Sequence, residues 1–355
     1  MIRSLAIAVT AVGLVVAPPR LDAQSGIFLD RSYVVHMWPD EGLLYEGKTA
    51  IPLTLHHGAD SLYATLRSPQ PSWSTGTMWY LTPMFVVRQL AANVDASLPV
   101  RTPSFMPKVD FQYLAARRIG GSIRQAAADY PLAAMILGFD GTFGHYSNGQ
   151  AGCFRANEKR TSASSGDCVI DPSAPPGSDT LNTVDGSFST WYFKVQGNMR
   201  YQYYKDSLPF TSFTLSAGVE WHPPFLEPIG GMDSSLAAVY GRIRPFAGAA
   251  LARRSEWSCP EAIPFGWLPC GRGRVKLDTY IEYLPTHPTN VSSVSTTTEL
   301  AWTFSRYAGI GPIVRLHTGQ DYYNMGLSHE LNVLQFGLTV DLERDIPLKR
   351  WRVCR

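Results

Sequence analysis

The stretch that decides the fold is Ser189–Tyr203, which reads STWYFKVQGNMRYQY. Its odd-numbered residues are mostly apolar or aromatic, for example Trp191, Phe193 and Val195, and its even-numbered residues are mostly polar. Side chains that alternate in this way lie on opposite faces of a β-strand, whereas a helix would mix them. The stretch therefore predicts a long strand with one apolar and one polar face.

The same alternation recurs along the chain, so the fold is expected to be all-β. Apolar and polar residues alternate clearly in three further stretches, and weaker candidates bring the total to roughly a dozen strands. The clear stretches are 213–221, 275–283 and 334–342, and the others are 51–56, 79–88, 108–115, 135–147, 239–247, 296–303 and 312–317. Such long strands suit a tilted membrane strand better than a sandwich.

The apolar face of these strands is expected to contact lipid, because it carries Trp, Tyr and Phe near the strand ends, as interfacial girdles do. We therefore predict a transmembrane antiparallel β-barrel of about 12 strands. Charges of both signs on the opposite face, such as Lys194, Arg200, Glu220 and Asp278, predict a hydrogen-bonded polar interior more than an open pore. The alternative is a secreted β-sandwich, which would turn the apolar face inward.

The composition agrees with an exported membrane protein. Charged residues make up 17% of the chain, and the net charge of +2 gives no electrostatic footprint for nucleic acid. Arg3 precedes an apolar run at 5–17 that is too short to span a bilayer, so residues 1–23 are expected to be a signal peptide. The barrel would then occupy 24–343 in a bacterial outer membrane, followed by a basic tail at 344–355.

Three long polar segments are expected to be extracellular loops, because the periplasmic turns of such barrels are short. These segments are roughly 151–186, 256–271 and 284–295. Two of them hold pairs of cysteines, Cys153 with Cys168 and Cys259 with Cys270. An exported chain passes through an oxidising compartment, so each pair is expected to form a disulfide, which leaves Cys354 unpaired.

The candidate chemistry lies in residues 137–149, LGFDGTFGHYSNG. His145 and Ser147 are two positions apart on the apolar face of the expected strand, which puts their Cα atoms about 6.5 to 7 Å apart. An imidazole can close that gap, and a serine hydroxyl becomes a good nucleophile when a base takes its proton. On the outer wall, such a pair would meet lipid ester groups at headgroup depth. The alternative is an interfacial histidine that is hydrogen-bonded to a nearby serine.

With the two residues that follow, the stretch reads His-Tyr-Ser-Asn-Gly, which resembles the His-x-Ser-Asn-Gly motif of the outer-membrane phospholipase A enzymes. Two further patches are similar to that family, SLPVR at 97–101 with SFMP at 104–107, and GQDYYN at 319–324. The resemblance implies an ester hydrolase that cleaves acyl chains from glycerophospholipids, with Ser147 as nucleophile and His145 as general base.

The resemblance also implies the remainder of the site. It makes the Gly149 amide an oxyanion donor. It makes Ser97 and the Gln150 carbonyl ligands of Ca²⁺, which the family binds at the interface of a homodimer. The family has an arginine where Gln150 stands, so a side-chain role at that position is not carried over.

The third catalytic residue departs from the family pattern. The family has an asparagine at the start of the next strand, whereas this chain reads DGSFSTW at 185–191 after a longer loop. By face parity Ser189 points outward beside Trp191, where it could orient the imidazole, and Ser187 and Asp185 share its parity. Two alternatives stay open: a lipid A deacylase-like esterase, which uses a carboxylate as third member, and a catalytically inactive porin-like barrel. Six other histidines are expected in loops or at the membrane interface: His56, His57, His222, His287, His317 and His329.

Overall fold

The computed structural model describes residues 28–343 except 39–42, 59, 68–71, 91–103, 120–131, 149–151, 154, 162–167, 176–181, 183–185, 206–207, 233, 258–270, 288–290, 305–308, 321–329 and 342. The expected signal peptide, the basic tail and the cysteines Cys259, Cys270 and Cys354 lie outside these residues. No helix in the described part of the chain is long and apolar enough to span a membrane, which is a statement about helices alone.

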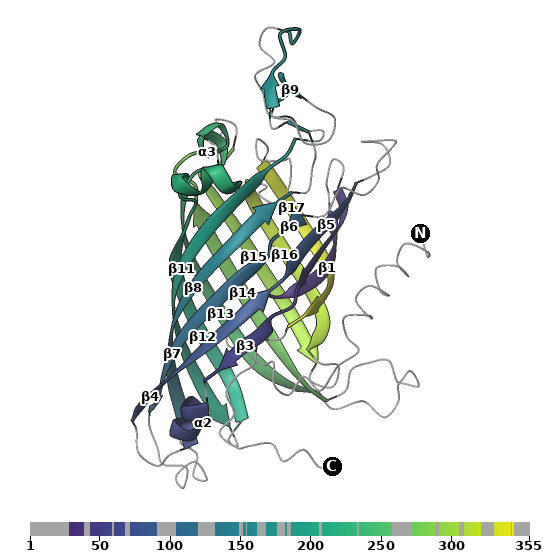
Figure 1. Ribbon diagram of the computed structural model, residues 1–355. Coiled ribbons are helices and arrows are strands. Elements are labelled where there is room, and N and C mark those ends of the chain that lie inside the picture. Colours follow the sequence, from purple (N-terminus) through teal and green to yellow (C-terminus); the bar gives the residue numbers. More distant parts are fainter. Residues whose placement is uncertain are drawn as a thin grey trace.

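The strands form one large antiparallel sheet that closes on itself (Figure 1). They are β1 (Ser32–Trp38), β2 (Leu43–Ala50), β3 (Leu53–His57), β4 (Trp73–Thr82), β5 (Met84–Leu90), β6 (Ser104–Phe105), β7 (Lys108–Ile119), β8 (Leu132–Ser147), β11 (Ser189–Lys205), β12 (Leu208–Trp221), β13 (Ile243–Trp257), β14 (Gly271–Tyr283), β15 (Val294–Phe304), β16 (Ile310–Gln320) and β17 (Glu330–Val340). The pairing of β8 with β11 and of β1 with β17 closes the ring.

Three of the barrel strands are interrupted at prolines, which have no N–H for the strand ladder. Pro52 separates β2 from β3, Pro83 separates β4 from β5, and Pro107 separates β6 from β7. Each of these pairs continues as one strand of the wall. The ring is therefore a closed 12-strand antiparallel barrel, and the predicted fold class is confirmed.

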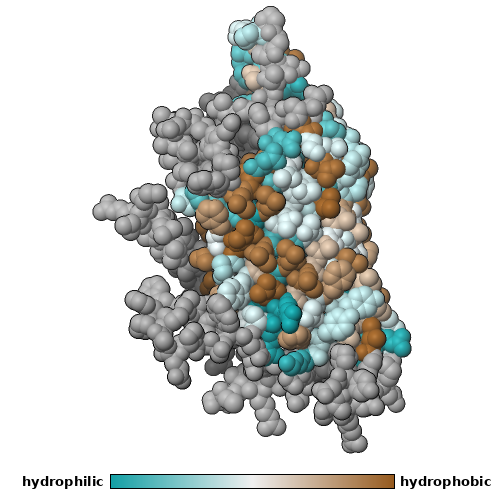
Figure 2. Space-filling model, turned by 180° about the vertical axis from the view of Figure 1, so that it is seen from behind, coloured by the Kyte–Doolittle hydropathy of each residue, from teal (hydrophilic) through white to brown (hydrophobic). Residues whose placement is uncertain are grey.

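The alternation of faces holds around the wall. In β11, Val195 and Tyr203 are 42% and 44% exposed on the outside, whereas Arg200 and Gln202 are 1% and 0% exposed on the inside. Figure 2 shows hydrophobic side chains gathered across the visible face of the wall. A closed barrel with this outer surface is compatible with an outer-membrane barrel.

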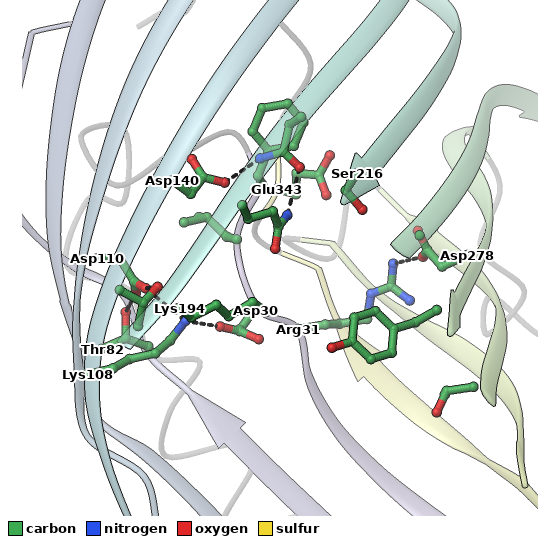
Figure 3. A pocket seen from close by; sticks show the side chains of 18 of the residues that line it. Asp30, Arg31, Thr82, Lys108, Asp110, Asp140, Lys194, Ser216, Asp278 and Glu343 are labelled. Atoms are coloured by element: carbon green, nitrogen blue, oxygen red, sulfur yellow. Dashed lines mark hydrogen bonds and ion pairs between the residues drawn. The ribbon is translucent and has the colours of Figure 1, made fainter. Parts of the chain in front are cut away.

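The lumen is filled by ion pairs, and the first described residues enter it. Arg31 binds Asp278 and Glu299 at 2.6 and 2.9 Å, and Asp30 binds Lys108 (Figure 3). Burial alone would raise the pKa of the Asp30 carboxyl, but its lysine partners hold that pKa well below the usual value. A cavity of about 420 Å³ is left among these side chains. The predicted polar interior is thus observed.

Short helices cover both ends of the barrel. Helix α2 (Asp60–Arg67) places Leu62 and Leu66 in an apolar cluster at the lower end in Figure 1. At the upper end, the segment between β12 and β13 forms the 3-10 helix η3 (Pro224–Ile229) and the helix α3 (Ser234–Tyr240). The hairpin of β9 (Glu158–Arg160) and β10 (Cys168–Ile170) projects beyond this upper end.

The structure corrects three sequence-based expectations. The predicted strand at 239–247 begins only at Ile243, because α3 extends to Tyr240 and Gly241 turns the chain with a φ of 84°. The connection at 256–271 joins β13 to β14 at the lower end, opposite the loop after β8, so the two loops are not on one side. One histidine that was expected in a loop or at the interface, His317, lies instead within β16 and is 4% exposed, whereas His222 lies in the connection after β12 and is 1% exposed.

Candidate active site

His145 and Ser147 lie at the upper end of β8, on the outward face that parity predicted. Phe143, on the same face, is 37% exposed, whereas Tyr146 between the two candidate residues is 2% exposed and points inward. Both His145 and Ser147 are partly buried. The structure therefore puts His145 and Ser147 at neighbouring outward positions of the wall, above its apolar band.

The strands on either side define what each residue faces. On β11, Trp191 is opposite His145 and Ser189 is opposite Ser147. On the other side, Phe105 is opposite Ser147. Ser147 thus has an aromatic ring on one flank and a second serine on the other.

The backbone beside His145 lacks one ladder hydrogen bond. The His145 N–H donates to the Pro107 carbonyl at 3.0 Å. A regular antiparallel pair would return a bond to the His145 carbonyl, but proline has no N–H with which to do so. The wall is therefore irregular directly next to the candidate base, at the break between β6 and β7.

The imidazole of His145 packs on the Trp191 ring, and no described residue orients it through a hydrogen bond to Nδ1. Its ring centroid is 4.5 Å from that of Trp191, and Trp191 stacks on Phe143 at 5.2 Å with an interplanar angle of 8°. Its Nδ1 atom is buried and has no hydrogen-bond partner among the described residues. A catalytic histidine needs its second nitrogen held by an acceptor, so this atom marks where a third member would act.

Ser189, the residue that was expected to orient the imidazole, forms a hydrogen bond to a different group. Its hydroxyl donates to the Gly230 carbonyl at 3.2 Å. Donation uses the single hydroxyl proton and leaves the lone pairs of the oxygen available as acceptors. The register places Ser189 opposite Ser147, two residue pairs along the ladder from His145, so the Ser189 hydroxyl would have to turn away from Gly230 to bind Nδ1.

Asn148 has a role that sequence reasoning did not assign. Its side chain is 0% exposed; its amide donates to the Gly186 carbonyl at 2.9 Å, and its Oδ1 accepts from the Phe188 N–H at 2.9 Å. The backbone N–H of Asn148 also donates to the Phe188 carbonyl at 3.0 Å. This motif residue therefore joins the end of β8 to the residues that precede β11. Its place directly after the serine was the only available sequence signal.

Four expected site residues lie outside the described part of the chain: Ser97, Gly149, Gln150 and Asp185. Ser187 is described, and its N–H donates to the Gly152 carbonyl at 2.9 Å. The oxyanion donor and the calcium ligands thus stay predictions.

The long loop after β8 contains the predicted disulfide between Cys153 and Cys168. The only group of possible metal-binding side chains found in the described residues is these two cysteines with Glu158. Since the two sulfur atoms are bonded to each other, they cannot act as thiolate ligands. This group is not a calcium site, because calcium takes oxygen ligands.

A scan against protein-family models finds no match to this chain, and comparisons with curated proteins and with solved structures find no similar protein.

Proposed function

We propose that this protein is an outer-membrane phospholipase A that hydrolyses acyl esters of glycerophospholipids. One observation carries the proposal: His145 and Ser147 project from adjacent outward positions at the upper end of β8, above an exposed apolar wall. A lipid in the surrounding leaflet would bring its ester group to these side chains without leaving the membrane. The residue pattern His-x-Ser-Asn-Gly adds the family resemblance to this geometry.

The reaction would proceed in two steps. The Ser147 hydroxyl attacks the ester carbonyl while His145 takes its proton, and His145 then returns the proton to the departing glycerol oxygen. Water, deprotonated by His145, next cleaves the acyl-serine and releases the fatty acid. The Trp191 ring packs against the imidazole at a tilt of 48° and limits its movement. The Ser189 hydroxyl oxygen is the candidate acceptor of a hydrogen bond from the Nδ1–H of His145.

Calcium and a homodimer enter the proposal through the resemblance alone. The expected ligands, Ser97 and Gln150, lie outside the described residues, so no step is assigned to the ion. A calcium requirement predicts that activity is lost in EDTA and restored by Ca²⁺. A dimer requirement predicts that chemical cross-linking in micelles rises together with activity.

The structure favours this function over the two alternatives. The lipid A deacylase-like esterases resemble an eight-strand design, whereas this barrel has twelve strands. An open porin needs a continuous channel, whereas here Arg31 and Asp30 cross the lumen in ion pairs. These observations support a barrel whose lumen is crossed by ion pairs and whose chemistry lies on its outer surface.

The decisive experiment compares the purified wild-type barrel with Ser147→Ala on mixed micelles of phosphatidylcholine and, separately, on lipid A. Wild type should release fatty acid from the phospholipid, and the variant should retain less than about one thousandth of that rate. A fluorophosphonate probe should label wild type and not the variant. A matched control is Ser173→Ala, on the loop after β10, which should keep full activity.

Three results would count against the proposal. Full hydrolysis by Ser147→Ala would place the nucleophile elsewhere. Absence of labelling and of hydrolysis in wild type, in both Ca²⁺ and EDTA, would favour an inactive barrel. Release of fatty acid from lipid A alone would favour the deacylase.

A further inference from the structure

The segment that follows β12 presents apolar side chains beside the candidate site. Phe225 and Ile229 in η3 are 63% and 64% exposed, and no residue of η3 is buried. Such large apolar side chains are unfavourable in water when they lie together. Trp221, at the end of β12, is also 40% exposed and packs edge-on against Phe225 at 5.9 Å.

Two hydrogen bonds fix this segment to the strand that faces His145 and Ser147. The Trp191 indole N–H donates to the Ile229 carbonyl at 2.9 Å, and the Ser189 hydroxyl donates to the Gly230 carbonyl. The shape of the turn requires glycine. Gly230 has a φ of 86°, and a Cβ at Gly231 would lie 2.4 Å from the backbone of Leu226.

Aromatic rings connect the candidate base to η3 along the outer wall. His145 contacts Trp191, Trp191 stacks on Phe143, and Phe143 contacts the next ring, Phe193, at 4.9 Å. The row continues from Phe193 to the Trp221 ring at 6.2 Å and ends at η3. The rings come from the neighbouring strands β8, β11 and β12 and from η3, and those on the strands belong to the outward face. The outer apolar surface is thus continuous from the site to Phe225 and Ile229.

We propose that η3 is immersed in the outer leaflet and that Phe225 and Ile229 hold the acyl chain of the lipid whose ester reaches Ser147. The occupant is a membrane lipid, because η3 extends the same apolar surface that the barrel wall offers to hydrocarbon. Aromatic and apolar side chains on one face are what lets a short element lie in the interfacial region. The role in chain binding rests on the proposed function, whereas the membrane contact rests only on the barrel lying in the membrane.

The first experiment measures the depth of η3 in lipid vesicles. A nitroxide is attached at Phe225→Cys in a background with serine at 259, 270 and 354. Its collision rates are measured with oxygen, which partitions into lipid, and with a water-soluble nickel chelate. Leu251→Cys on the outer wall gives the lipid-facing reference, and Ile170→Cys on the β10 hairpin, 71% exposed, gives the aqueous one.

The label at 225 should resemble the label at 251, with oxygen collisions dominant. Nickel accessibility equal to that at 170 would overturn the membrane contact. This result does not depend on whether the protein is an enzyme, so it separates the inference from the proposed function.

The second experiment tests chain binding. The double variant Phe225→Ser with Ile229→Ser should lose about tenfold or more in kcat/KM for long-chain phosphatidylcholine, because two apolar contacts with the chain are removed. Hydrolysis of a soluble butyrate ester below its aggregation limit should change less than about twofold. Ile170→Ser, an equally exposed apolar position on the hairpin, should leave both rates unchanged.

A failure of the acyl-chain role of η3 can be distinguished from a failure of the proposed function. Equal losses on both substrates, or no loss on the long-chain lipid, would overturn the acyl-chain role while hydrolysis by wild type still stands. If wild type shows no hydrolysis that depends on Ser147, the proposed function is wrong and the acyl-chain role of η3 is wrong as well. The accessibility of the label at 225 still tests whether η3 contacts the membrane. Migration of the unheated variants as folded barrels on detergent gels checks that the double substitution leaves the fold intact.

Discussion

Replacing Ser189 by asparagine should increase hydrolysis, because it offers a hydrogen-bond acceptor to the buried Nδ1 of His145, which has no partner in the described part of the chain. The serine hydroxyl donates to Gly230 and forms no bond with the imidazole. An asparagine side chain is longer and has both an amide donor, which can keep the bond to Gly230, and a carbonyl acceptor, which can reach toward Nδ1.

The expected change in kcat/KM follows from the free energy of the one hydrogen bond that Nδ1 of His145 gains. A net intramolecular hydrogen bond contributes about 0.5–1.5 kcal/mol. If that bond forms when the imidazole carries the proton in the transition state, the same energy raises kcat/KM by about 2- to 12-fold. Ser189→Ala removes the bond to Gly230 and also the acceptor that a rotated Ser189 hydroxyl would offer to Nδ1 in the transition state, so it should lower kcat/KM by up to a factor of similar size.

The assay is fatty-acid release from mixed micelles at saturating and limiting lipid, for wild type, Ser189→Asn and Ser189→Ala. Ser292→Asn, a serine-to-asparagine change in the loop before β15, is the matched control and should have no effect. The reasoning is refuted if Ser189→Asn is no faster than wild type while Ser189→Ala keeps full activity. In that case Ser187 or Asp185 becomes the residue to replace next.

Three further predictions concern the barrel around the site. Arg244→Met leaves the Glu282 carboxylate buried without the two hydrogen bonds of 2.8 and 3.0 Å that it accepts, so it should lower the free energy of unfolding in detergent by about 3–5 kcal/mol. Adding Glu282→Leu should restore most of that loss, and a double variant as unstable as the single one would contradict this account. Replacing Cys153 and Cys168 by serine opens a disulfide loop with a sequence separation of 15, and the closed loop contributes roughly 3 kcal/mol through chain entropy. Proteases should therefore cut the loop of the variant sooner, while the barrel stays intact. Equal cleavage times for the variant and wild type would argue against a stabilising role of the disulfide. Because the pKa of Asp30 is lowered in the folded protein, the stability that its ionised carboxylate contributes is fully present above the usual carboxyl pKa and decreases as the pH falls below that value. In urea titrations, Asp30→Asn should reduce this loss of stability at low pH. An unchanged dependence of the free energy of unfolding on pH would show that Asp30 contributes little.

The fold was predictable from the sequence because the two faces of a membrane strand are visible in the alternation of neighbouring residues, without knowledge of distant segments. Alternation in Ser189–Tyr203 gave the strand, its exposed face and its polar face, and the structure has all three. Closure and strand count were harder to predict, because they depend on pairings between distant segments. The first strand, β1, was missed, and the prolines that divide three strands obscured their continuity.

The candidate site was predictable only where two residues share a strand. The outward placement of His145 and Ser147 follows from their spacing of two. The partners across the ladder depend on the register between β8 and β11, which a loop of about forty residues leaves open to sequence reasoning. For the same reason the contacts of Ser189 and Trp191 with the segment after β12 had no signal in the sequence.

The entry of Arg31 into the lumen bears on how the molecule is made. Its guanidinium binds carboxylates that come from β14, β15 and the residue after β17, all of which are synthesised late. The ring also closes between its first strand and its last. Neither the ion pairs of Arg31 nor the pairing of β1 with β17 can therefore be complete until β17 and Asp341 are in place. A chain that lacks Arg31 would close around a lumen in which Asp278, Glu299 and Asp341 have lost their shared cation, so these carboxylates would repel one another.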